Sequence, residues 1–136
     1  MRSTYSTLMQ SRFFNPAFNS AIFDGPVRIY FTQAQESLAL KIYFYLQQKF
    51  PEALNHAKSV HPDVGRNILV MIYPSSDSFQ LSFEGHSDFM VQDELADDVL
   101  LGINGPFEDD QLPQIAERIS EIFLTWEADH APALQL

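Results

Sequence analysis

Four short segments of the chain have the apolar patterning of β-strands. Residues 27–31 (VRIYF) and 79–83 (FQLSF) alternate apolar with polar or amphipathic side chains, which predicts strands with one buried face. Residues 67–73 (NILVMIY) and 99–103 (VLLGI) are almost continuously apolar, a pattern typical of interior strands covered on both faces. The segment 79–83 has the clearest period of two in the sequence, and a short loop of hairpin length precedes it.

Residues 33–50 predict a long amphipathic helix. Thr32 precedes the helix and Gln35 follows three positions later, which is the spacing of a capping box. In such a box the two side chains satisfy free backbone donors at the start of the helix. Pro51 should end the helix, because proline lacks the amide donor that a helix interior requires. Apolar side chains extend well around this helix, so we expect it to be covered on more than one side.

A second helix is predicted near the C-terminus, where apolar residues recur down one helical face from Leu112 to Trp126. Asp109 and Asp110 precede this pattern, at positions where acidic residues favour the start of a helix. Pro113 is tolerated because it falls in the first turn.

The predicted order of elements is arm–β–α–β–β–β–α. This order predicts an α+β protein, a two-layer sandwich in which both main helices cover one face of a four-stranded mixed sheet. The opposite face is either solvated or covered by the N-terminal segment. Residues 51–66 read as a connector and residues 85–98 as a loop with one helical turn. We expect a single domain at residues 27–128, preceded by an arm at 1–26 and followed by a flexible tail at 129–136.

The N-terminal arm is rich in phenylalanine. Phe13, Phe14, Phe18 and Phe23 follow neither a two-residue nor a 3.6-residue period. Each ring buries on the order of 150–250 Å2 when covered, so four rings must pack against something. Either the arm covers its own domain, or the arm and the helix surface at residues 42–45 form an interface, most often a symmetric homodimer. We expect the homodimer, with Phe13, Phe14 and Phe18 as partner-binding residues.

Acidic residues are concentrated in the C-terminal half of the chain. The net charge is −10, and residues 69–136 contain Arg118 as their single basic residue against 14 acidic ones. Nucleic acids and anionic membranes require Lys or Arg, so we expect neither as a partner. The charge matches a basic protein partner, or it simply keeps a small protein soluble.

The densest acidic stretch contains Asp93, Glu94, Asp97 and Asp98. It lacks the D-x-[DN]-x-[DN]-G signature of a calcium loop, so we expect solvated side chains and no metal. Together with the charge asymmetry, these four residues are predicted to bind the protein partner.

Two His-x-Asp triplets, His61 with Asp63 and His86 with Asp88, are the remaining candidates for chemistry. A histidine beside a carboxylate can serve a metal site or act as a general base. Zinc sites have three or four ligands at recognisable spacings, and no third element fixes the geometry here. We expect ordinary loop histidines with no metal, cofactor or catalytic role, and keep these four residues as the catalytic candidates of an alternative hypothesis.

The chain has no cysteine, no apolar signal-peptide core near its N-terminus and no run of 18 apolar residues. These features favour a cytoplasmic protein that neither enters nor crosses a membrane.

Three functional hypotheses follow from the sequence. The preferred one is a non-catalytic protein-interaction or adaptor module, homodimeric, whose acidic C-terminal half faces a protein partner. The alternative is a small metal- or small-molecule-dependent enzyme or sensor in which the two His-x-Asp loops converge. The third is a structural subunit whose arm completes the sheet or groove of another protein.

Overall fold

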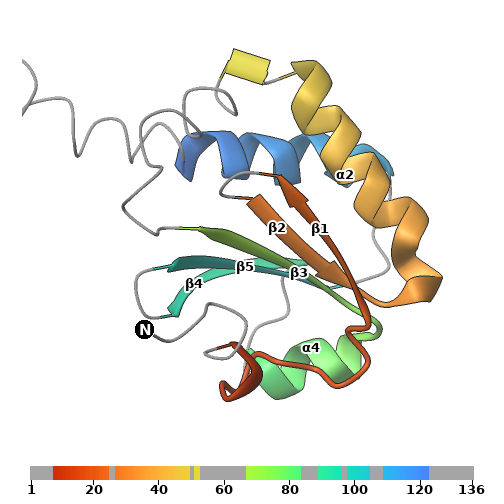
Figure 1. The fold of residues 1–136 in the computed structure, drawn as a ribbon, viewed down its shortest axis with the longest axis vertical. Coiled ribbons are helices and arrows are strands. Elements are labelled where there is room, and N and C mark those ends of the chain that lie inside the picture. Colours follow the sequence, from red (N-terminus) through yellow and green to blue (C-terminus); the bar gives the residue numbers. More distant parts are fainter. Residues whose placement is uncertain are drawn as a thin grey trace, which may run out of the picture.

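The computed structural model describes residues 8–24, 27–49, 51–52, 67–83, 89–95, 98–104 and 109–122. It confirms the expected α+β class, because helices pack on a mixed sheet whose strands do not close into a barrel (Figure 1). The sheet has five strands in place of the expected four. The expected tail at 129–136 and most of the 51–66 connector lie outside the described residues.

The strands of the sheet lie in the spatial order β1-β2-β3-β5-β4. Three of them, β2, β3 and β5, run parallel to one another, whereas β1 and β4 pair antiparallel at the two edges. All six residues of β3 are buried, which confirms the interior strand that its continuous apolar run predicted. The bounds are β1 Ser20–Asp24, β2 Val27–Phe31, β3 Ile68–Tyr73, β4 Met90–Leu95 and β5 Asp98–Asn104.

The edge strand β1 lies inside the segment that was expected to be an arm. It pairs with β2 so that Ile22 lies opposite Ile29 and Phe23 opposite Arg28. Its exposure alternates, with Ala21 and Phe23 exposed and Ile22 half-buried, as one expects of an edge strand. The irregular spacing of phenylalanines before it hid this short alternation in the sequence.

One face of the sheet is covered by α2 (Glu36–Lys49) and by a helix at residues 112–122 (Figure 1). A 3-10 turn, η1 (Gln33–Gln35), leads into α2, and another, η2 (Asp109–Gln111), precedes the second helix. Both helices were expected, and their buried side chains line the core under this face. These side chains are Ala39, Ile42, Leu46, Ile115, Ala116, Ile119 and Ile122.

The opposite face of the sheet is covered by residues 8–19, called the N-terminal segment below, and by α4 (Ser76–Ser82), which lies below the sheet in Figure 1. The protein therefore has three layers, with the sheet between two covers, in place of the expected two. A second apolar core fills the space between this cover and the sheet. Its buried members are Leu8, Phe13, Phe18, Tyr30, Leu69, Met71, Tyr73, Phe79, Phe83 and Leu100.

The prediction of a strand at residues 79–83 is wrong, because this segment lies in and directly after helix α4. The hydroxyl oxygen of Ser75 accepts a hydrogen bond from the Ser78 amide, and the Ser78 hydroxyl oxygen accepts one from the Ser75 amide, both at 3.2 Å. This capping box starts the helix. Phe79 and Phe83, four positions apart, are then buried, whereas Leu81 between them is 84% exposed.

The expected loop at 85–98 contains a strand, because residues 90–95 form β4. β4 pairs with β5 along its whole length, with Val91 opposite Gly102 and Asp93 opposite Leu100. Its mixture of acidic and apolar residues shows only weak alternation. The strand is therefore determined by its neighbour in the sheet more than by its own sequence.

The expected capping box at the start of α2 is also wrong, because the Thr32 side chain makes no cap hydrogen bond. Its hydroxyl donates instead to Oε1 of Gln35 at 3.1 Å, and Nε2 of Gln35 donates to the backbone carbonyl oxygen of Tyr73 at 2.8 Å. Gln35 is buried, so its amide must find partners inside the protein. The pair joins the start of the helix to the end of β3.

Candidate functional site

The two His-x-Asp triplets, His61 with Asp63 and His86 with Asp88, lie outside the described residues. Within the part of the chain that the structure describes, no group of three or more His, Asp or Glu side chains is arranged to hold a metal ion.

The acidic residues that the sequence grouped together have different surroundings. Asp93 and Glu94 lie on the edge strand β4, Asp98 is the first residue of β5, and Asp97 falls outside the described residues. Asp98 is buried, and its Oδ1 accepts hydrogen bonds from the backbone amide of Asn67 at 2.8 Å and from Nδ2 of Asn67 at 3.3 Å. Asp98 therefore holds the start of β5 next to the start of β3.

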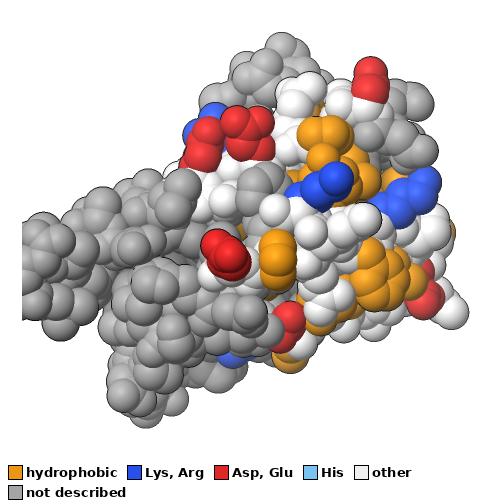
Figure 2. Space-filling model, turned by 90° about the horizontal axis from the view of Figure 1, so that it is seen from above, with side chains coloured by type: hydrophobic (Ala, Val, Ile, Leu, Met, Phe, Trp, Pro, Cys, Tyr) orange, Lys and Arg blue, Asp and Glu red, His pale blue; other side chains and the backbone are white. Residues whose placement is uncertain are grey.

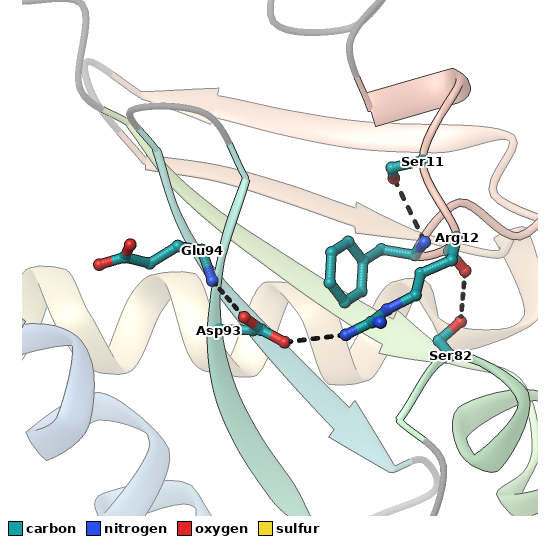
Figure 3. Close-up of polar contacts among 6 residues, drawn as sticks. Ser11, Arg12, Ser82, Asp93 and Glu94 are labelled. Atoms are coloured by element: carbon teal, nitrogen blue, oxygen red, sulfur yellow. Dashed lines mark hydrogen bonds and ion pairs between the residues drawn. The ribbon is translucent and has the colours of Figure 1, made fainter.

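Asp93 forms an ion pair with Arg12 of the N-terminal segment (Figure 3). Nη2 of Arg12 lies 3.3 Å from Oδ2 of Asp93, and the two side chains are 69% and 38% exposed. The other carboxylate oxygen of Asp93 accepts a hydrogen bond from the Glu94 amide at 2.7 Å. Because both partners are solvated, the pair contributes only about 0–1 kcal/mol to stability. It shows that the acidic edge strand can accept a guanidinium group.

The backbone around Arg12 is fixed by two serines (Figure 3). The Ser82 hydroxyl of α4 donates to the Arg12 carbonyl oxygen at 3.0 Å, and the Ser11 hydroxyl oxygen accepts from the Phe13 amide at 3.2 Å. The guanidinium group also lies over the Phe13 ring, 4.8 Å from its centroid. The N-terminal segment is thus attached to α4 and to β4. The sequence pointed to Asp93 as a residue that binds a protein partner, but it did not indicate Ser11, Arg12 or Ser82 as residues of a site.

The phenylalanines expected to bind a partner lie mainly inside the protein. Phe13 and Phe18 are 6% and 7% exposed and belong to the second core, whereas Phe14 is half-buried and packs edge-on against Phe18. In this structure the N-terminal segment covers its own domain. Phe13 and Phe18 can reach another protein only if the segment leaves the sheet.

Two other aromatic side chains remain at the surface. Phe23 is 60% exposed and Phe44 is 56% exposed, while every other aromatic residue that the structure describes is buried or half-buried. The sequence pointed to the helix surface at residues 42–45, which includes Phe44, but placed Phe23 in an arm. In the view from above, hydrophobic side chains reach the surface beside Lys and Arg side chains on the right, where α2 lies (Figure 2).

Phe23 and Phe44 lie on elements that meet at the β1 edge of the sheet. The Arg28 guanidinium group lies 5.0 Å from the centroid of the Phe23 ring on one face of the strand pair. On the helix-covered face, the hydroxyl of Tyr43 donates to Oδ2 of Asp24, the last residue of β1, at 2.9 Å. Burial raises the pKa of the Tyr43 phenol, and this hydrogen bond to a carboxylate raises it further. Tyr43 therefore ties α2 to the end of β1, and the Phe44 ring lies next to that of Tyr43, with the ring centroids 5.6 Å apart.

Comparisons of this chain with protein-family models, with curated proteins and with solved structures find no match. Within the described residues, none of the helices combines the length and the apolar character that crossing a bilayer requires.

Proposed function

We propose that this protein is a non-catalytic protein-interaction module that works as a homodimer and presents acidic side chains to a protein partner. The observation that carries the proposal is the exposure of Phe23 on the edge strand β1, at 60%, and of Phe44 on α2, at 56%, where the neighbouring Tyr43 binds the end of β1. Exposed aromatic side chains are typical of protein interfaces, where they supply large contact areas.

The acidic part of the proposal rests on β4. Glu94 is exposed, and Asp93 keeps 38% of its side chain accessible while it pairs with Arg12. A lysine or arginine of a partner can approach this strand from solvent and share or replace the contact that Arg12 makes. Such a contact is a charge pair at the rim of an interface, so it should speed association and weaken with salt.

Native mass spectrometry of the full-length protein tests the dimeric part of the proposal. A dimer mass with nothing else bound supports the interaction module. A stoichiometric metal or small-molecule mass on the protein contradicts it and favours the alternative of an enzyme or sensor.

Affinity capture at low and high salt tests the acidic part, with wild-type protein and the Glu94→Lys variant immobilised in parallel. We expect the variant to capture less of the partner that the wild type retains at low salt, because its charge is reversed at an exposed position. The matched control is Glu36→Lys, an exposed acidic position in the first turn of α2. Equal capture by Glu94→Lys and wild type would show that β4 does not face the partner.

A further inference from the structure

The two edges of the sheet differ in how many charged side chains they carry, and such charges hinder an edge strand from pairing with another chain. At the β4 edge, Asp93 and Glu94 place charges on the strand, and Arg12 lies against it. Charged side chains are a common means by which proteins prevent an edge strand from pairing with another chain. The β4 edge is therefore protected.

The β1 edge lacks this protection. Its sequence, SAIFD, has one charged residue, Asp24, which lies at the end of the strand and accepts a hydrogen bond from Tyr43. Within the part of the chain that the structure describes, no strand pairs with the outer side of β1. An edge strand of this composition, with few charges along it, can pair with another strand.

We infer that β1 pairs with β1 of a second copy of this chain, in an antiparallel register centred on Ile22, so that the two five-stranded sheets become continuous. The inference rests on the homodimer proposed above and specifies the surface through which that homodimer forms. A two-fold axis through Ile22 makes the contact isologous, as expected of a closed dimer. It also places the α2 helices of both copies on the same side of the joined sheet.

The side chains of β1 are complementary to one another in this register. Ala21 lies opposite Phe23 of the second copy, so the small side chain leaves room for the large ring. Ser20 lies opposite Asp24 of the second copy. This pairing joins a hydroxyl donor to a carboxylate and keeps the two Asp24 carboxylates of the dimer apart. Ile22 lies opposite Ile22 of the second copy on the helix-covered face, where each side chain already packs against its own core. Apolar, hydroxyl–carboxylate and aromatic pairs of this kind stabilise antiparallel strands.

The flanking aromatics add contact area to that of a five-residue strand. A stable interface buries roughly 800 Å2 on each partner, more than one short strand provides. Phe23 extends the contact on the face where Arg28 and Tyr30 lie next to it. On the other face, Phe44 lies beside Tyr43, which binds the end of β1, so its exposed ring can extend the contact there. The proposed contact therefore uses both exposed aromatic side chains.

Sedimentation equilibrium on the full-length protein and the Ala21→Lys variant tests the inference. Ala21 is exposed, so the lysine leaves the fold intact but places a charge opposite Phe23 of the second copy. We expect the dimer dissociation constant to rise by about tenfold or more, the effect typical of a change at the centre of an interface. The matched control is Leu81→Lys, which alters an 84% exposed side chain on α4 and should leave dimerisation unchanged.

Cysteine cross-linking tests the register independently, because the chain has no cysteine of its own. Cα atoms of residues opposite one another in antiparallel strands are about 4.5–5.5 Å apart, within the range that a disulfide bridges. Under mild oxidation, Ile22→Cys should therefore form a covalent dimer by itself. Ser20→Cys and Asp24→Cys should cross-link when mixed, and far less when each is oxidised alone.

The possible outcomes distinguish a failure of the proposed β1 contact from a failure of the homodimer itself. A dimer that Ala21→Lys does not weaken, and in which Ile22→Cys does not cross-link, overturns pairing through β1 but leaves the homodimer in place. Efficient cross-linking of Asp24→Cys alone overturns the register. A wild-type protein that stays monomeric at high concentration overturns both the surface and the dimeric part of the proposed function.

Discussion

The hydroxyl of Tyr73 donates a 2.7 Å hydrogen bond to the backbone carbonyl oxygen of Phe13, sixty positions earlier in the chain. Tyr73 ends the central strand β3 and is fully buried. Its ring contacts those of Phe18, Phe79 and Phe83, with centroid distances of 5.3, 5.7 and 5.8 Å. One side chain thus joins the sheet, the N-terminal segment and α4.

Tyr73→Phe should lower the free energy of unfolding by about 1–3 kcal/mol, because the variant leaves the buried carbonyl group of Phe13 without its donor. Urea denaturation followed by fluorescence measures the change. Tyr45→Phe, at a half-buried position on α2, is the matched control and should cost less. Equal stability of Tyr73→Phe and wild type would show that the hydrogen bond does not hold the N-terminal segment.

The buried phenol of Tyr73 should also make the protein less stable at alkaline pH. Burial raises the pKa of the Tyr73 phenol above the ordinary tyrosine value of about 10. Above that pH the unfolded chain releases the proton while the native protein keeps it, so the contribution of Tyr73 is present below about pH 10 and falls as pH rises.

Denaturation at a series of pH values from about 8 to 11 measures this effect, over a range that spans the ordinary tyrosine pKa. We expect the free energy of unfolding to fall more steeply for wild type than for Tyr73→Phe above about pH 10. Parallel curves for the two proteins would contradict the prediction. Tyr43→Phe serves as a comparison, since the pKa of Tyr43 is also raised but its side chain is only half-buried.

Gly102 of β5 has no space for a side chain. A Cβ atom built there would lie 2.5 Å from Cζ of Phe83 and closer still to Cε2 of the same ring. Gly102→Ala should therefore destabilise the protein by about 1–3 kcal/mol, the cost typical of overpacking a core. Thermal or urea unfolding of the purified variant measures the loss.

A double-mutant cycle with Phe83→Leu identifies the cause of that loss. The smaller side chain removes the clash, so Gly102→Ala should cost less in the Phe83→Leu background than in wild type. The same cost in both backgrounds would mean that the Phe83 ring is not what excludes a side chain at Gly102.

The sequence predicted those elements whose own pattern is sufficient to define them. The run at residues 67–73 is short and contains β-branched side chains, which favours a strand, and the apolar positions of the helix at 112–122 recur at the helical period. Phe79 and Phe83 were misread, because a separation of four residues fits both a strand face and a helix face. The serines before Phe79 decide between the two, since their mutual hydrogen bonds start a helix.

The candidate surfaces were less predictable, because they depend on where the N-terminal segment lies. Arg12 and Asp93 are 81 positions apart, and no local pattern indicates that they meet. The segment's phenylalanines could equally have covered another subunit. Phe23 could be recognised as a surface residue only once β1 was known to be a strand at the edge of the sheet.

Asp98 and Asp93, neighbours in one acidic stretch, should respond differently to substitution by alanine. Asp98→Ala removes the acceptor of two hydrogen bonds from Asn67 and should lower the free energy of unfolding by about 1–3 kcal/mol, because the Asn67 amide loses its partner. Asp93→Ala breaks a solvated ion pair and should cost less than about 1 kcal/mol. Urea denaturation of both variants compares them directly, and equal losses would contradict the distinction. Because Asp98 supports the fold, substitutions that test partner binding should be made at Asp93 and Glu94, where a loss of binding can be separated from a loss of stability.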